Sequence, residues 1–355
     1  MNYLQSTDLS LIRIEASTFC NAKCPHCPRY TDDGYLHDYI PSAHLSLSAL
    51  QNGLDPTKLI NLKEVIIEGD RGDPFMNPDI ISIIKFFDFV PLVKVYTNGS
   101  LRNTDFWQEL AQIPNLLVMW SIDGLEDTNP LYRIGTDYRK IMNNVKSFID
   151  AGGTAVWKCV VFRHNEHQID SIKKQAAELK FKGTQFIKAY QYRFQGLATW
   201  PVYIEGQRLH DLEPTSMSED QVYCLSSYRN AIYPKKNNLS CPWMNQETVY
   251  INALGQLIPC CMMVSETTNN YVGKDILQSM MGGTFDHISL YNYSLDKILY
   301  KRYGQKFEKT LQAVETMHPV CAKGCSSIIF NGADKFIGIA VSKTKAEEDA
   351  LRTVT

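Results

Sequence analysis

Three cysteines lie close together near the start of this chain, in the stretch CNAKCPHC. They are Cys20, Cys24 and Cys27, with the spacing C-x3-C-x2-C. An even number of thiols would suit disulfides or a closed tetrahedral zinc site, whereas an odd, tight set suits a metal centre with one open position. Three thiolates on one loop can hold three irons of a [4Fe–4S] cluster, which leaves the fourth iron available for another ligand.

Structural zinc is the alternative for this first cysteine group. Zinc needs a fourth ligand, and the neighbouring His26 lies between two of the cysteines, where it would strain to reach the same ion. The spacing therefore favours the open iron–sulfur cluster over zinc.

A second group of cysteines lies in the last third of the chain. The residues ETVYINALGQLIPC predict a β-hairpin that turns at residues 252–255. A hairpin with thiols near both ends, together with a distant C-x3-C pair, could form a four-thiolate site, for which spacing alone also allows zinc. The four candidate ligands are Cys241, Cys260, Cys321 and Cys325.

Short β-branched or aromatic runs alternate with helix-like segments over residues 11–191, which predicts βα units around a parallel sheet. The six predicted strands are residues 11–17, 64–69, 93–98, 117–123, 155–162 and 184–191. Between the fourth and fifth of these strands, residues 137–153 predict an amphipathic helix that stops at Gly152 and Gly153. An open doubly wound sheet and a partial barrel both fit this pattern.

The first cysteine group directly follows the first predicted strand. In βα folds the carboxyl ends of the strands form the edge where ligands and chemistry collect. We therefore expect the metal centre at this edge. The rest of the chain is expected to comprise a linker of irregular structure at residues 196–240, a second module at 241–335 and a charged tail at 336–355.

Composition and charge exclude several classes of protein. The chain has 355 residues with 44% hydrophobic and 21% charged residues, which is typical of a globular protein. A net charge of −2 gives no electrostatic footprint for nucleic acid or an anionic membrane. The N-terminus has no signal-peptide pattern, and ten cysteines without such a signal indicate a reducing, cytoplasmic location.

The C-x3-C-x2-C motif after the first strand resembles the signature of the radical S-adenosylmethionine (radical SAM) superfamily. The resemblance implies a partial (β/α)6 TIM-type barrel over residues 1–195, a [4Fe–4S] cluster and bound S-adenosylmethionine (SAM). It also implies that Cys20, Cys24 and Cys27 are the catalytic metal ligands, and that an electron donor such as flavodoxin or ferredoxin is a partner.

Other short motifs follow the order of that family. RGDP, residues 71–74, resembles the Gly-Gly-Glu-Pro motif that holds the SAM amino group, with Arg71 and Asp73 as departures from it. YTNG, SIDG with the following YR, and FRHNEHQI resemble further SAM-contacting segments. The resemblance implies these cofactor-binding residues: His26, Gly72, Asp73, Thr97, Asn98, Ser121, Asp123, Arg133 and Asn165. Without the family context, Asp73 and Thr97 to Gly99 could be turn residues, and Asn165 could be a helix cap.

The second cysteine group resembles the "twitch" domain, a shortened form of the SPASM domain, through its C-x13-G-x4-C and later C-x3-C pattern. This implies a small α+β domain that holds one auxiliary [4Fe–4S] cluster, so that two clusters are expected in all. Cys261 is adjacent to Cys260 and is not expected to face the same way. The auxiliary cluster would accept an electron from the substrate.

Strand alternation indicates which residues face the lumen of the barrel. In residues 11–17, Ile12, Ile14 and Ala16 share one face, so that Arg13 and Glu15 would point into the lumen. The lumen candidates for substrate binding are Glu15, Lys158, Lys188 and Tyr190. Structural pairing among these charges is the favoured alternative.

These patterns together predict a radical SAM enzyme that oxidatively modifies a peptide side chain or a small polar metabolite. A cofactor-forming cyclase of the molybdopterin-biosynthesis type is a second enzyme hypothesis. A non-catalytic iron–sulfur or zinc protein for electron transfer or structure is the hypothesis from a different class. Only nineteen residues precede Cys20, which lowers the expectation of an N-terminal leader-binding domain.

Overall fold

The structure is a computed structural model that describes residues 4–25, 27–189, 198–217, 247–259, 263 and 274–307. The predictions made for His26, Tyr190, the four auxiliary cysteines, Cys261 and the tail concern residues outside these ranges.

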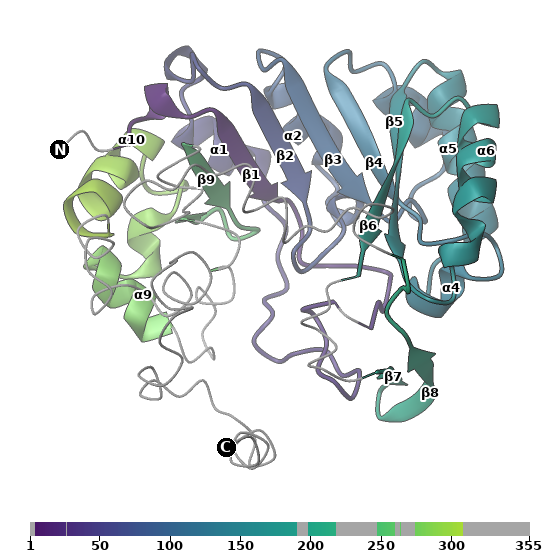
Figure 1. The fold of residues 1–355 in the computed structure, drawn as a ribbon. Coiled ribbons are helices and arrows are strands. Elements are labelled where there is room, and N and C mark those ends of the chain that lie inside the picture. Colours follow the sequence, from purple (N-terminus) through teal and green to yellow (C-terminus); the bar gives the residue numbers. More distant parts are fainter. Residues whose placement is uncertain are drawn as a thin grey trace, which may run out of the picture.

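An eight-stranded sheet in the order β10-β9-β1-β2-β3-β4-β5-β6 forms the centre of the fold. Strands β1 to β6 are parallel, β9 is parallel to β1, and β10 is antiparallel to β9. Because β10 and β6 are edge strands, the barrel is open, as the partial-barrel prediction requires (Figure 1). The strand bounds are β1 Leu11–Glu15, β2 Glu64–Glu68, β3 Leu92–Thr97, β4 Leu116–Ser121, β5 Thr154–Val161, β6 Gly183–Lys188, β9 Thr248–Ile251 and β10 Leu257–Ile258. The six predicted strands are confirmed, and each begins within one residue of its predicted start.

Helices pack against one face of this sheet. Except for the short helix at residues 129–132, they share one hydrophobic core with the alternate residues Ile12, Ile14 and Ala16, which are fully buried. The bounds are α1 Leu47–Gly53, α2 Ile80–Phe86, α3 Thr104–Leu110, α4 Asn129–Tyr132, α5 Tyr138–Asp150 and α6 Ile169–Glu178. The 3-10 helices are η1 Ser6–Asp8, η2 Pro56–Lys58, η3 Pro74–Met76 and η4 Glu166–Gln168.

Helix α5 shows why the pattern predicted these elements well. Asp137 caps its N-terminus by accepting from the backbone N–H of Lys140. Its apolar stripe is buried, with Ile141 and Phe148 fully covered. The predicted stop is confirmed: Gly152 has a φ of +95°, and the N–H of Gly153 donates to the carbonyl of Phe148 at 2.9 Å.

The predicted hairpin of the second module is confirmed and joins the barrel sheet. Strand β9 pairs with β1, with Arg13 opposite Tyr250, and β10 returns along β9. Helices α9 (Lys274–Met281) and α10 (Leu295–Ile298) lie beyond β9 in Figure 1. The 3-10 helix η8 (Phe285–Ile288) precedes α10, and the π-helix η9 (Leu299–Phe307) follows it.

The expected irregular linker contains an ordered hairpin, so that this expectation was wrong for residues 200–212. Strands β7 (Trp200–Ile204) and β8 (Gln207–Leu212) pair antiparallel and lie below the carboxyl ends of the barrel strands in Figure 1. The two-residue turn is Glu205 and Gly206, both with positive φ, as a primed hairpin turn requires. Val202 and Leu212 are fully buried, which anchors the hairpin.

Within the described part of the chain, no helix has the length and apolar character needed to cross a membrane.

Candidate functional site

The first cysteine group lies on the loop after β1, at the carboxyl edge of the sheet. Cys24 is 7% exposed, and Cys20 and Cys27 are partly buried; all three carry thiols rather than disulfides. The N–H of Ala22 lies 3.4 Å from the Cys20 sulfur, and the side-chain amide of Asn98 lies 3.8 Å from it. The loop therefore gathers thiols at the predicted edge and points donors at a sulfur.

This arrangement fits a cluster better than one shared ion. No three His, Cys, Asp or Glu side chains among the described residues lie close enough to bind a single metal ion. In a [4Fe–4S] cluster each thiolate binds a different iron, so that the ligands do not converge on one point. N–H donors to the sulfurs are also a feature by which proteins tune such clusters. The cysteines and their donors thus fit the cluster that the motif implies.

Burial makes two thiols of this loop, those of Cys20 and Cys24, hard to ionise. It raises the pKa of Cys20 to about 12, with smaller contributions from the nearby Asp73 and Cys24. Burial also raises the pKa of Cys24, although the Arg133 guanidinium acts in the opposite direction. Since metal ligands must be thiolates, cluster binding has to displace protons from this loop.

The Asp73 carboxylate ties the loop after β2 to the end of β3. It is 3% exposed and accepts hydrogen bonds from the backbone N–H of Asn98 at 2.8 Å, the N–H of Phe75 at 3.0 Å and the Thr97 hydroxyl. The structure therefore places Asp73 and Thr97 beside the cysteine loop in a structural network. Their contact with SAM stays a prediction.

Gly72 lets the same loop approach the end of β1 very closely. A Cβ at this position would lie 2.0 Å from the carbonyl oxygen of Ser17. The N–H of Asp73 donates to the carbonyl of Phe19 at 2.8 Å, which fixes the loop against the residue before Cys20. Only glycine allows this approach, which explains its place in the motif.

Arg133 connects the end of β4 to the cysteine loop. Its Nε lies 2.6 Å from a carboxylate oxygen of Asp123, which is fully buried, and its Nη1 lies 3.7 Å from the sulfur of Cys24. Asp123 also accepts from the N–H of Val160 at 2.6 Å. The two residues predicted to bind SAM thus lie together, with Arg133 held against Cys24, a predicted cluster ligand.

The remaining predicted cofactor residues are Asn98, Ser121 and Asn165, and they lie at different places along the carboxyl edge of the sheet. Asn98 is 4% exposed and donates to the side chain of Asn21 as well as toward Cys20. Ser121 lies on β4 beside Lys158 of β5. Asn165 is 1% exposed and holds the end of β5, because its amide donates to the carbonyl of Asp123 and its oxygen accepts from the N–H of Phe162.

The lumen face is the face of the sheet opposite the helices; strand register assigns Arg13, Glu68, Tyr96, Ser121 and Lys158 to it. The ammonium of Lys158 lies 4.8 Å from the centre of the Tyr96 ring. Burial lowers the pKa of Lys158, and the nearby Arg133 adds to this. Lys158 therefore faces the lumen, as predicted from strand alternation.

Two other substrate candidates have different surroundings. Glu15 is fully buried and pairs with Arg71, which supports the structural alternative for this residue. Lys188 lies on the opposite face from Lys158, because it pairs in register with Val161 of the helix-side core, and its ammonium donates to the carbonyl of Met217. The expectation that Lys188 shares the lumen with Lys158 was therefore wrong. Successive residues of β6 point to opposite faces of the sheet, and the register with β5 places Lys188 on the helix side.

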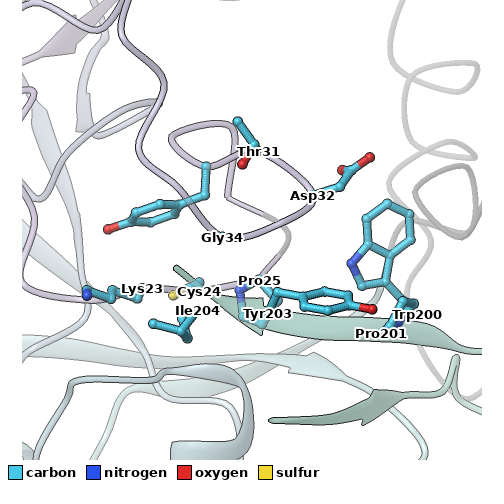
Figure 2. Close-up of a pocket in the computed structure, with 11 residues that line it drawn as sticks. Lys23, Cys24, Pro25, Thr31, Asp32, Gly34, Trp200, Pro201, Tyr203 and Ile204 are labelled. Carbon is cyan, nitrogen blue, oxygen red and sulfur yellow. The ribbon is translucent and has the colours of Figure 1, made fainter. Parts of the chain in front are cut away.

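Sequence reasoning did not anticipate that the β7–β8 hairpin lies against the cysteine loop. Lys23 forms an ion pair with Glu205 at 2.7 Å, and the side chains of Trp200 and Tyr203 line a small pocket with Cys24 (Figure 2). The alternation of VYI and RLHDL around Glu205 and Gly206 was the available signal for a hairpin. No local pattern indicated which loop it would cover.

The family model "Radical SAM superfamily" matches residues 14–187. Residues 14–187 thus form a radical SAM domain, which indicates an enzyme.

The chain is similar to the cysteine-type anaerobic sulfatase-maturating enzyme of Clostridium novyi (strain NT), with 24% identity over 204 residues, 50% of each chain. It thus spans about half the length of that curated relative. Among solved structures it is similar to native anSMEcpe with bound AdoMet, at a TM-score of 0.53 and 16% identity, covering 90% of this chain and 89% of that one. It is also similar to Streptococcus suis SuiB bound to S-adenosylmethionine, at a TM-score of 0.50 and 12% identity, covering 72% and 61%. At these identities the structures show a shared fold.

Proposed function

We propose that this protein binds a [4Fe–4S] cluster at Cys20, Cys24 and Cys27 and uses SAM to modify a peptide side chain or a small polar metabolite by oxidation. The observation that carries the proposal is the meeting of three chain segments at one sheet edge. The cysteine loop contacts the Asp73 loop there through Phe19, and it contacts Arg133 through Cys24.

When bound, the cluster and SAM would supply a hydrogen-abstracting radical. The chain itself would hold the cluster through the three thiolates and direct the Arg133 guanidinium to the Cys24 sulfur. A small apolar core that includes Ala22, Phe162 and Leu212 surrounds the cysteine loop and limits the access of water. A dry site is what radical chemistry needs.

A peptide is the favoured substrate class. One solved structure of similar fold is anSMEcpe with bound AdoMet and Cp18Cys peptide, at a TM-score of 0.53 and 15% identity. The sulfatase-maturating relative also has a protein substrate by its name. A small polar metabolite remains the alternative within the same proposal, and an electron donor of the flavodoxin or ferredoxin type would supply the reducing electron.

The decisive experiment is anaerobic reconstitution followed by reduction with dithionite in the presence of SAM. We expect 5′-deoxyadenosine to form, and we expect the Cys24→Ala variant to form none because two thiolates cannot hold the cluster correctly. Arg139→Ala is the matched control, because it removes only an exposed ion pair, and it should form as much 5′-deoxyadenosine as the wild type. Unchanged turnover in Cys24→Ala would contradict the proposal.

The proposal includes an auxiliary [4Fe–4S] cluster at Cys241, Cys260, Cys321 and Cys325. Iron and sulfide analysis should then give about eight of each per chain. The double variant Cys321→Ala, Cys325→Ala should keep about half the iron and still form 5′-deoxyadenosine, yet fail to complete the product. Stoichiometric zinc with little sulfide in the wild type would instead favour a structural zinc site.

The same measurements separate the two other hypotheses. A molybdopterin-type cyclase would form 5′-deoxyadenosine with a nucleotide substrate rather than with a peptide. A non-catalytic iron–sulfur or zinc protein would form none with any substrate.

A further inference from the structure

A half-buried aspartate, whose carboxyl oxygen Oδ2 is buried, lies where the barrel meets the β9–β10 hairpin. Asp70 follows β2 by two residues, and its nearest charged neighbours include Glu15, Glu68 and Arg13. The hydroxyl of Tyr250, on β9, interacts with the Asp70 carboxyl. Because Tyr250 pairs in register with Arg13, both belong to the lumen face. Asp70 is therefore at the lumen, at the carboxyl end of β2.

The neighbouring acids differ from Asp70 in their partners. Glu15 pairs with Arg71 at 2.7 Å, and Glu68 pairs with Arg13. Asp70 makes no ion pair with any residue that the structure describes, and apart from the Tyr250 hydroxyl none of them donates to its buried Oδ2. A buried carboxyl oxygen with so few donors is costly to the fold, so that a ligand contact is a good reason for its presence.

The surroundings of Asp70 keep a proton on it up to neutral pH. Burial raises its pKa to about 7, and the charges of Glu68 and Glu15 add to this effect; Tyr250 and Arg13 act in the opposite direction. A group that titrates near the working pH is the most effective general base or acid. The chemistry of Asp70 is thus suited to taking a proton from a substrate in the lumen.

We propose that Asp70 is the catalytic residue that accepts a proton from a substrate whose oxidised carbon carries a hydroxyl or thiol group. This inference rests on the proposed function. The group H–C–X–H, with X as oxygen or sulfur, first loses a hydrogen atom from carbon to the radical. The X–H proton then goes to Asp70, the remaining electron goes to an acceptor of the oxidised iron–sulfur class, and the C=X bond forms.

The position of Asp70 suits this division of proton and electron. Ile258 of β10 pairs with Tyr250, whose hydroxyl lies beside Asp70. Cys260, a proposed ligand of the auxiliary cluster, follows Ile258 by two residues in the sequence. The proposed proton acceptor therefore lies beside the hairpin whose second strand leads, in the sequence, to one of the proposed ligands of the electron acceptor.

The test compares the isosteric variant Asp70→Asn with the control Asp88→Asn, an exposed aspartate after α2. The probes are two synthetic peptides, one with a single cysteine and one with serine at the same place. The reconstituted full-length protein is given SAM and dithionite over a range of about pH 5 to 9. Both 5′-deoxyadenosine and the peptide aldehyde, trapped with a hydrazine, are measured. The serine peptide gives the aldehyde directly, and the cysteine peptide gives a thioaldehyde that water hydrolyses to the aldehyde with release of hydrogen sulfide.

We expect Asp70→Asn to form 5′-deoxyadenosine as the wild type does but to lose aldehyde formation by about 100-fold or more. The wild-type aldehyde yield should rise with pH through neutrality, and Asp88→Asn should reproduce it. Aldehyde formation by Asp70→Asn at the wild-type rate and with the same pH profile would overturn the proposal.

An infrared titration of the carboxyl band in wild type minus Asp70→Asn decides the case in which neither peptide is modified. A band that titrates near neutral pH supports the role of Asp70, and one that titrates near pH 4 overturns it. Absence of 5′-deoxyadenosine in the wild type would instead count against the proposed function, so that the two failures are distinguishable.

Discussion

Glu15 and Arg71 form a buried ion pair with three contacts, and this pair joins β1 to the loop that leads into Asp73. The Arg71 Nη2 lies 2.7 Å and its Nε 3.1 Å from the two carboxylate oxygens, and its backbone N–H donates to the same carboxylate at 3.0 Å. The side chains are 0% and 2% exposed. An arginine thus replaces the first glycine of the motif because the chain supplies a buried carboxylate to receive it.

Removal of one partner of this pair should destabilise the protein strongly. We expect Glu15→Ala to lower the free energy of unfolding by about 3–5 kcal/mol, because the Arg71 charge would remain buried without a partner. Chemical denaturation measures the change. The exposed pair Arg139–Glu126 supplies the control, since Glu126→Ala should cost at most about 1 kcal/mol. Equal effects of the two variants would show that the buried Glu15–Arg71 pair contributes no more to the free energy of unfolding than an exposed pair does.

Gly72 should be intolerant of a methyl group. In Gly72→Ala the new Cβ would meet the carbonyl of Ser17 at 2.0 Å, so that the loop must move away from β1. We expect SAM affinity, measured by equilibrium dialysis, to fall about tenfold or more, which corresponds to a loss of about 1.4 kcal/mol or more of binding free energy. Gly183→Ala is the control because nothing lies within 4 Å of its Cβ. Normal SAM affinity in Gly72→Ala would show that this loop does not contact SAM.

The elements of the fold were predictable because their signals are local. Alternating β-branched residues predicted all six strands, and the apolar stripe and terminal glycines predicted α5. The cysteine loop was predictable because its three thiols lie within eight residues. In contrast, the Glu15–Arg71 pair joins residues 56 positions apart, and no local pattern reports such a contact. The face of Lys188 depends on the register of β6 with β5, which strand alternation alone does not fix.

Arg133 should raise the reduction potential of the proposed cluster. Its Nη1 lies 3.7 Å from the Cys24 sulfur, and a cationic N–H donor stabilises the extra negative charge of the reduced state. In Arg133→Lys the charge remains near Asp123 but the fork that reaches the sulfur is lost. We expect a more negative potential in a redox titration followed by electron paramagnetic resonance. Arg139→Lys should leave the potential unchanged, and an unchanged value in Arg133→Lys would remove this role.

The charge of Lys158 in the lumen should lower the free energy of unfolding. Burial lowers its pKa, so that the folded protein disfavours the charged form and loses stability as pH falls toward neutrality. Lys158→Met should therefore raise the free energy of unfolding by about 1 kcal/mol near neutral pH, and it should weaken binding of a substrate that uses this charge. Lys182→Met, at an exposed position, should change neither property. Destabilisation by Lys158→Met would show that its contact with Tyr96 has a structural purpose.

Asp70 should make stability depend on pH in a direction opposite to that of a paired carboxylate. Its pKa in the folded protein, about 7, is above the ordinary value of 3.8, so that the folded state binds the proton more tightly than the unfolded state does. Its contribution is fully favourable below about pH 4 and is lost as pH rises through about 7. Asp70→Asn removes this loss. We therefore expect the variant to match the wild type near pH 4 and to be more stable by about 1–3 kcal/mol near pH 8. The full pKa shift would give roughly 4 kcal/mol, and the expected gain is smaller because the residue is partly exposed. Urea denaturation at the two pH values measures the difference, with Asp88→Asn as the flat control. A stability gain that is the same at both pH values would show that Asp70 ionises normally in the folded protein.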